Sequence, residues 1–218
     1  LVHQGEQTRL GRGVYDTGCL QPEAIADTVR AVAAFAIRAR GQGAESIRTL
    51  ATSAAREAVN ADELTLALVA HDLELEIIDG QAEAELILRG VRSHADFKSG
   101  PLAVIDVGGG STELLIADHV RLLTQQSFPL GTIRCLEQFP PSNPPTSSNR
   151  QVVLQAVDEF LNEQVAPMIG DAPFPATLIG AGGTPIFLAR IQSASADLTL
   201  SELETSTMSR AEIQSLVD

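Results

Sequence analysis

The chain has 218 residues, 44% of them hydrophobic, which suffices for one large domain or two smaller domains with buried cores. Its formal net charge of −13 excludes the broad basic surface that general binding to nucleic acids or acidic membranes requires. The charge still allows a polyanion in a local site, provided that a cation or fixed arginines offset the wider negative field.

The sequence also carries no signal for membrane insertion or secretion. No run of about 18 apolar residues occurs, so no transmembrane helix is expected. The first residues lack the cationic start and apolar centre of a signal peptide. Cys19 and Cys135 give neither a CxxC motif nor a disulfide framework. We therefore expect a protein of the reducing cytoplasm.

The first half of the chain alternates between helical and strand patterns. After a polar loop at 1–20, a helix is expected to begin at Pro22, because proline suits the first helical turn, and to end at Gly41. Strands and helices are then predicted to alternate at 46–53, 61–72, 73–79 and 81–94. This order favours an α/β arrangement with parallel strands.

The pattern changes at 97–101, which predicts two domains at 1–98 and 99–218. Beyond this boundary, short turns separate three apolar segments, and short turns join only antiparallel neighbours. We therefore predict an antiparallel meander with strands at 102–107, 113–118 and 120–130. A Pro/Ser loop, a helix and a strand–glycine turn–helix segment are predicted to follow at 138–150, 152–169 and 176–191.

The two halves differ in how they begin. The second opens with a meander, whereas the first opens with a loop. If the halves are structural duplicates, the first lacks its opening strands. A last helical pattern begins at 209 and is not completed. We therefore expect a fragment of a longer protein.

The stretch VIDVGGGSTELLIAD, at 104–118, places Asp106 at the end of one predicted strand and Glu113 at the start of the next. A hairpin would bring both carboxylates to the same end of the pair, and such oxygen ligands suit Mg²⁺ together with waters and substrate phosphate. The intervening glycines allow backbone N–H groups to form an anion-binding concavity. The predicted phosphate-binding residues are Gly108, Gly109, Gly110, Ser111 and Thr112. The alternative is a plain tight hairpin whose carboxylates are solvated.

A second glycine turn, GAGGT at 180–184, follows a predicted strand and precedes a predicted helix. Amides at the start of a helix bind phosphate in this geometry. Gly182, Gly183 and Thr184 are therefore further candidates for phosphate binding, with close strand–helix packing as the alternative.

Charged residues at two places in the first half add further candidates. Arg56 follows a predicted strand, where its guanidinium could bind phosphate through two nitrogens or could simply be solvated. Glu83 and Glu85 lie in the first turn of a predicted helix, where carboxylates stabilise the helix dipole. From the residues alone, a capping role explains both glutamates.

Five stretches together resemble the exopolyphosphatase/guanosine pentaphosphate phosphatase family, and they occur in that family's order. They are LATSAAREAVN, IIDGQAEAELILRGV, VIDVGGGSTELLIA, FPLGTIRCLEQF and LIGAGGT. The glycine stretch alone would also suit other actin-like ATPase relatives, whereas its combination with T-S-A-x-R-E-A-x-N is much more specific. The resemblance covers nearly the whole chain.

The resemblance implies an α/β fold of two actin-like (ASKHA, ribonuclease H-like) domains that flank a cleft, the first domain lacking its opening strands. It implies hydrolysis of the terminal phosphoanhydride bond of inorganic polyphosphate, or conversion of guanosine pentaphosphate to the tetraphosphate in the stringent response. Glu83 would be the catalytic base, and Arg56 would face the phosphates. Asp106 and Glu113 would be associated with Mg²⁺ or another divalent cation. Members are often dimers, so a homodimer is a further expectation.

Two departures from the family pattern are visible. The first phosphate loop, D-x-G-[ST]-N-S, is absent, and Glu85 stands where many relatives have arginine. The sequence does not distinguish polyphosphate from guanosine pentaphosphate. Two other functions stay open, namely an actin-like small-molecule kinase and a module that binds guanosine tetra- or pentaphosphate without turnover.

Overall fold

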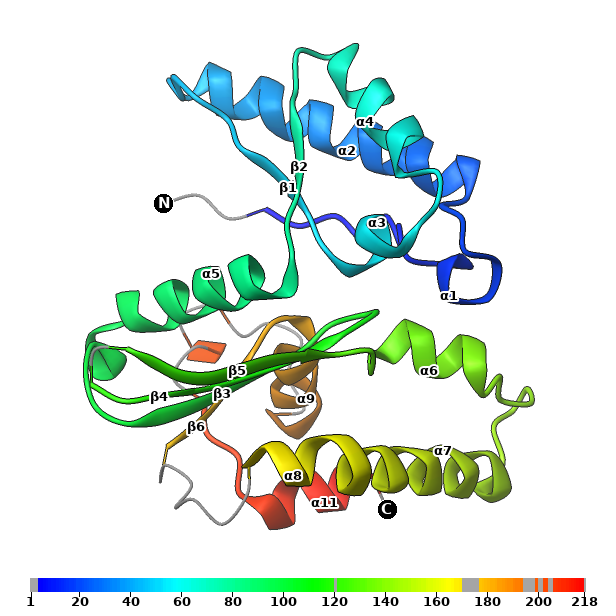
Figure 1. Ribbon diagram of the computed structural model, residues 1–218, viewed down its shortest axis with the longest axis vertical. Coiled ribbons are helices and arrows are strands. Elements are labelled where there is room, and N and C mark those ends of the chain that lie inside the picture. Colours follow the sequence, from blue (N-terminus) through cyan, green and yellow to red (C-terminus); the bar gives the residue numbers. More distant parts are fainter. Residues whose placement is uncertain are drawn as a thin grey trace. The chain divides into compact units, whose positions relative to one another are not determined.

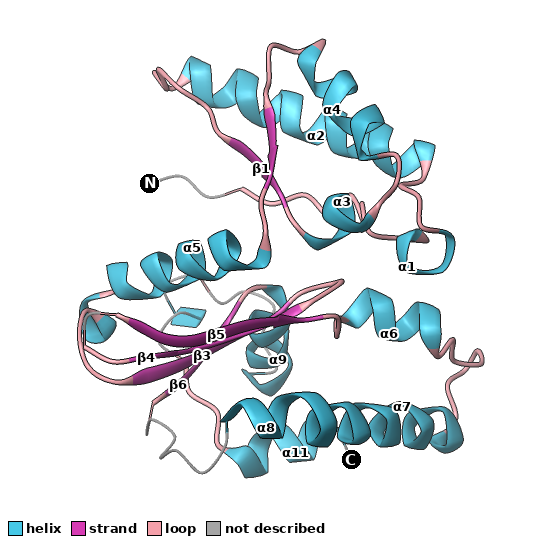
Figure 2. Cartoon of the chain, in the orientation of Figure 1, coloured by secondary structure: helices cyan, strands magenta, loops and turns pink. Residues whose placement is uncertain are grey.

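The computed structural model describes residues 4–119, 121–169, 177–193, 199, 202–203 and 206–217 (Figures 1 and 2). Residues 1–3, 120, 176 and 218, for which the sequence predicted a loop, strands and a helix, lie outside the described residues. The chain divides into two compact units, each considered by itself. Unit 1 comprises Leu1–Glu83 and Gly131–Ala172, and unit 2 comprises Ala84–Leu130 and Pro173–Asp218. The two units are defined by contacts within each unit and are not the two domains expected from the sequence, whose bounds at 98/99 stay a prediction.

Unit 1 contains a short parallel sheet and several helices. Strands β1 and β2 pair in parallel, from Thr49 opposite Leu75 to Ala51 opposite Ile77, which confirms the predicted parallel arrangement. Both strands are shorter than predicted. The elements of unit 1 are α1 (Val14–Thr17), α2 (Pro22–Gly41), β1 (Thr49–Ala51), α3 (Ser53–Glu57), α4 (Ala61–Val69), β2 (Leu75–Ile77), α6 (Thr132–Gln138), α7 (Ser147–Phe160), the π-helix η2 (Leu161–Val165) and α8 (Ala166–Ile169).

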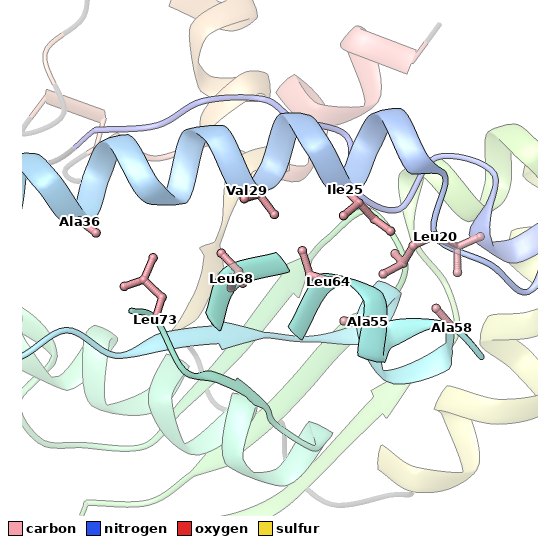
Figure 3. Close-up of a cluster of buried hydrophobic side chains, with 10 residues drawn as sticks. Leu20, Ile25, Val29, Ala36, Ala55, Ala58, Leu64, Leu68 and Leu73 are labelled. Atoms are coloured by element: carbon pink, nitrogen blue, oxygen red, sulfur yellow. The ribbon is translucent and has the colours of Figure 1, made fainter. Parts of the chain in front are cut away.

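The core of unit 1 lies between α2 and α4. Figure 3 shows Ile25 and Val29 on α2 facing Leu64 and Leu68 on α4. Both leucines are 1% exposed, and burial of such a side chain contributes about 1.5–3 kcal/mol. Ala55 of the short helix α3, which follows β1, belongs to the same core, so the core helps to hold α3 in place.

Unit 2 contains a four-stranded sheet in the order β5-β4-β3-β6. The first three strands form the predicted antiparallel meander, and β6 pairs with β3 in parallel. Helix α5 (Gly80–Ser93) begins in unit 1 and continues into unit 2. The other elements are the 3₁₀ helix η1 (Ala95–Phe97), β3 (Leu102–Val107), β4 (Thr112–Ala117), β5 (Leu122–Phe128), β6 (Leu178–Ala181), α9 (Gly183–Ser193) and α11 (Arg210–Val217).

Helices cover both faces of this sheet (Figure 1). Leu102, Val104 and Leu115 pack against Ala84 of α5, whereas α9 contacts β3 and β6 on the other face. Alternate residues of a strand share a face, so Asp106 continues the row of Leu102 and Val104. The apolar cluster therefore leads directly to a carboxylate at the end of β3.

Two parts of the predicted loops are helical. Helix α1 lies within the predicted loop at 1–20, and α6 was not predicted. Helix α7 begins inside the predicted loop at 138–150, because Thr146 and Asn149 form a reciprocal capping box at its start. It continues through η2 into α8. Among the helices that the structure describes, none is long and apolar enough to cross a membrane.

Candidate active site

The register of the sheet in unit 2 places two acidic side chains side by side. Asp106 on β3 lies directly opposite Glu113 on β4, and such cross-strand partners have Cβ atoms about 4.5–5.5 Å apart. Glu113 is only 2% exposed, and the Ser127 hydroxyl donates a 2.7 Å hydrogen bond to its Oε1. Ser127 is the cross-strand partner of Glu113 on β5. Three adjacent strands thus orient one carboxylate pair.

The electrostatics of this pair favour a cation. Burial, and next the nearby charge of Glu113, raise the pKa of Asp106 above its ordinary value. In the described part of the chain, no group of three or more His, Cys, Asp or Glu side chains could hold a metal ion. Two carboxylates nevertheless fit an ion such as Mg²⁺, which keeps several waters and takes further oxygens from substrate phosphate.

The second glycine turn lies directly against Asp106. Strand β6 pairs with β3 so that Ala181 lies opposite Asp106, and Gly182 follows with a φ of +81°. A Cβ atom on Gly182 would lie 2.1 Å from Oδ1 of Asp106, so any larger residue would have to displace this carboxylate and adopt a φ that favours glycine. The structure therefore brings Gly182, at the start of the second turn, to the carboxylate that begins the first.

Several predicted phosphate donors bind acceptors within the protein. The hydroxyl of Thr184 donates to the carbonyl of Val107 at 2.7 Å, and that of Thr112 donates to the carbonyl of Leu130. The N–H of Gly108 donates to the carbonyl of Ser111 at 2.9 Å. These bonds stabilise the turns, so a phosphate could use these three donors only by replacing a protein acceptor.

In unit 1 the structure brings Arg56 and Glu83 together. Nη1 of Arg56 donates to the carbonyl of Ile78 at 2.7 Å and to Oε2 of Glu83 at 3.3 Å. The two side chains are 28% and 15% exposed. Asp79 accepts a hydrogen bond from the N–H of Ala82 and thereby caps the first turn of α5, which carries Glu83.

The remaining motif residues are placed differently. Glu85 is exposed on α5, two residues after Glu83. Asn60, the last residue of T-S-A-x-R-E-A-x-N, accepts from the N–H of Leu20 and donates to its carbonyl. Asn60 therefore has a structural role, because it attaches the N-terminal segment to α4.

A polar network around α3 was missed by the sequence-based reasoning. Nη2 of Arg134 donates to both carboxylate oxygens of Glu57, at 2.6 and 2.7 Å, and its guanidinium lies over the ring of Tyr15. A cavity of about 390 Å³ adjoins this network and is lined by Tyr15, Asp16, Arg134, Glu137 and Gln138. The available signal was positional, since Glu57 follows Arg56 and Arg134 lies in FPLGTIRCLEQF.

The sequence profile of the Ppx/GppA phosphatase family matches residues 1–218. The chain belongs to the Ppx/GppA phosphatase family. This membership confirms the resemblance inferred from the five motifs.

Individual members of the Ppx/GppA family support the same assignment. The chain is 35% identical over 185 residues to exopolyphosphatase 2 of Mycobacterium tuberculosis, covering 81% of this chain and 56% of that protein. It is 29% identical over 158 residues to a guanosine-5'-triphosphate,3'-diphosphate pyrophosphatase of Vibrio vulnificus, covering 71% of this chain and 31% of the relative. The chain thus spans about half the length, or less, of these curated relatives.

A solved structure shows the fold. An exopolyphosphatase from Cytophaga hutchinsonii superposes with a TM-score of 0.87 at 27% identity, covering 99% of this chain and 70% of that chain. The predicted α/β fold class of this family, which the resemblance identified as actin-like, is confirmed.

Proposed function

We propose that this chain is part of a phosphoanhydride hydrolase that releases the terminal phosphate of inorganic polyphosphate or of guanosine pentaphosphate. The observation that carries the proposal is the carboxylate pair Asp106–Glu113, held in register and packed against the glycine turn at Gly182. The names of the relatives, exopolyphosphatase and guanosine pentaphosphate pyrophosphatase, agree with this chemistry. A cytoplasmic location and a homodimer remain predictions.

Asp106 and Glu113 would hold a divalent cation, for which Mg²⁺ is our choice. The ion would offset the phosphate charge near a protein whose net charge is −13. Ser127 keeps the buried carboxylate of Glu113 oriented through one of its oxygens. Gly109, Gly110 and Ser111 of the first glycine turn, with Gly182 and Gly183 of the second, would surround the terminal phosphate at this edge of the sheet.

Arg56 and Glu83 would supply the charge and the base. A phosphate oxygen that pairs with Arg56 would compete with Glu83 for the guanidinium, because the two side chains share an ion pair. A carboxylate oxygen of Glu83 would then accept the proton of the attacking water while the water oxygen bonds to phosphorus. The bridging P–O bond breaks, and the electron pair leaves with the shortened chain.

The test is release of inorganic phosphate with Mg²⁺, measured in parallel on long-chain polyphosphate and guanosine pentaphosphate. It uses this chain and a version extended by the segments that its relatives carry outside the matched region. We expect Glu83→Gln to lower turnover by about 10²–10⁴-fold. Glu85→Gln is the matched control, because it removes the same charge from an exposed position on α5.

Three results would overturn the proposal. The first is near-normal turnover in Glu83→Gln. The second is tight binding of guanosine pentaphosphate by the extended protein without phosphate release, which would indicate a binding module. The third is formation of ADP from ATP with a hydroxyl substrate, which would indicate a kinase.

A further inference from the structure

Helix α3 has five residues, and its last two are charged side chains held by different elements. Arg56 contacts the carbonyl of Ile78, next to β2, and the carboxylate of Glu83 on α5. Glu57 contacts Arg134 on α6. A helix this short has little stability of its own, so side-chain contacts determine its orientation.

Neighbouring side chains hold both Glu57 and Arg134 in place. Both oxygens of Glu57 accept from Nη2 of Arg134, and Oε1 also accepts from the hydroxyl of Ser53 at 2.9 Å. The Arg134 side chain is 18% exposed and its Cζ lies 4.0 Å from the centroid of the Tyr15 ring. The Glu57 side chain is 40% exposed, so the contact gains from its charge-assisted geometry more than from burial.

Helix α6 is itself attached at a second point. The carboxylate of Glu137 accepts hydrogen bonds from the backbone N–H groups of Gly13 and Tyr15. Arg134 therefore extends from a helix that is also held on the N-terminal segment, through backbone groups that lie outside α3. This fixed support allows Arg134 to determine where Glu57, and with it α3, is placed.

We propose that Glu57 and Arg134 are a pair of positioning residues that hold α3 so that Arg56 is directed at the phosphates. The inference rests on the proposed function, because it takes Arg56 as the phosphate-binding arginine. Neither residue needs to touch the substrate. Their effect is transmitted along the backbone, since Glu57 directly follows Arg56 on α3.

A positioning role predicts a pattern in the kinetic constants that a general loss of stability does not predict. In Arg134→Gln, Glu57 loses its partner and α3 loses one of its two charged anchors. A displacement of about 1 Å at a positioned group can lower turnover by roughly 10²-fold, so we expect kcat/KM to fall by about 10- to 100-fold. The change should divide between kcat and KM as it does in Arg56→Gln.

The decisive experiment is a double-mutant cycle between Arg56→Gln and Arg134→Gln in the extended protein. Two quantities are measured, namely phosphate release with Mg²⁺ and binding of polyphosphate without divalent cation. If Arg134 acts through Arg56, the double variant should be no weaker than Arg56→Gln alone. Additive losses would overturn the proposal, because they would mean that Arg134 acts independently of Arg56.

Arg48→Gln is the matched control. Arg48 forms an ion pair of similar length with Glu76, at 2.6 Å, but this pair is exposed and does not involve α3. Its kcat/KM should stay at the level of the unaltered protein. Melting temperatures of all variants show whether lost activity follows lost stability, and Glu57→Gln replaces Arg134→Gln in the cycle if the latter does not fold.

The outcomes also separate this inference from the proposed function. If Arg56→Gln lowers polyphosphate binding but Arg134→Gln and Glu57→Gln do not, only the positioning role is overturned. If Arg56→Gln changes neither binding nor turnover, Arg56 is not the phosphate-binding arginine and the positioning role fails with it. The proposed hydrolysis is tested separately, by phosphate release in Glu83→Gln. Partial recovery in Arg134→Lys, which keeps the charge but not the planar fork, would support the positioning role.

Discussion

The two units hold their charged residues in opposite ways. In unit 2, the register of β3 and β4 places two like charges, Asp106 and Glu113, opposite each other. In unit 1, side-chain contacts join opposite charges, Arg56 with Glu83 and Glu57 with Arg134. The first arrangement is determined by the backbone and leaves negative charge to be balanced. The second is determined by side chains and is already balanced.

This difference determines what each region offers to a polyanion. The carboxylate pair repels phosphate unless a cation neutralises it, so it can contribute to phosphate binding only with a bound ion. Arg56 needs no cation, but a phosphate would compete with Glu83, which already accepts from its Nη1. Steric changes near Asp106 and Glu113 should therefore have the largest effects on stability. Changes to the side-chain contacts of unit 1 should have smaller effects, which depend on how many contacts are lost.

The largest effect is expected at Gly182, where the Asp106 carboxylate leaves no room for a Cβ atom. Gly182→Ala would place a Cβ atom 2.1 Å from Oδ1 of Asp106, at a φ of +81° that favours glycine. Displacement of the partly buried Asp106 carboxylate together with backbone strain should cost about 2–4 kcal/mol of unfolding free energy. Urea unfolding of the purified chain, followed by circular dichroism, measures this loss.

Gly183→Ala is the matched control for stability in that experiment. Its Cβ would meet no atom within 4 Å, and Gly183 has no positive φ. Equal unfolding free energies for the two variants would contradict the steric account of the turn. They would also remove the main evidence that unit 2 has the less tolerant of the two regions.

The features set by the strand register near one turn could be predicted from the sequence, whereas the long-range contacts could not. The register of Asp106 and Glu113 could be predicted because strand, glycine turn and strand are adjacent in the chain, so the pattern determines the pairing. The contact of Gly182 with Asp106 could not, because it depends on a parallel pairing between β3 and β6, which are far apart in sequence. Motif order alone does not specify which strands become neighbours.

The network of unit 1 escaped prediction for a related reason. Arg134 and Glu57 are 77 residues apart, and no local pattern indicates that they meet. Helix α6 was missed as well, because a proline-rich loop follows its seven residues and obscures the helical pattern. Arg56 and Glu83 were identified from motifs, but their mutual ion pair became visible only in the structure.

A second prediction concerns the raised pKa of Asp106 and the sign of its effect on stability. Because burial and Glu113 raise the pKa of Asp106, the folded chain binds more protons than the unfolded chain above the ordinary value of 3.8. The contribution of Asp106 to stability therefore falls as the pH rises from that value through the raised pKa. Asp106→Asn removes this loss, so it should be more stable than the unaltered chain above the raised pKa.

Thermal unfolding in a chelator across this pH range tests the sign. Added Mg²⁺ should then stabilise the unaltered chain and have little effect on Asp106→Asn, since the cation would bind the charged pair. Asp96→Asn, at an exposed position in η1, is the control. A stability difference between Asp106→Asn and the unaltered chain that does not change with pH would contradict the raised pKa of Asp106.

The smallest effect is expected in the side-chain network. Tyr15→Phe removes the 3.3 Å contact between the phenol and the Ser53 hydroxyl but keeps the ring beneath Arg134. Loss of one weak hydrogen bond should cost about 0.5–1.5 kcal/mol. Tyr15→Leu, which also removes the aromatic face, should cost more, because the cation–π contact is lost. Urea unfolding of both variants separates the two contributions. If Tyr15→Phe proved as damaging as Gly182→Ala, the network of unit 1 would be as rigid as the strand register of unit 2, and the contrast between the two regions would fail.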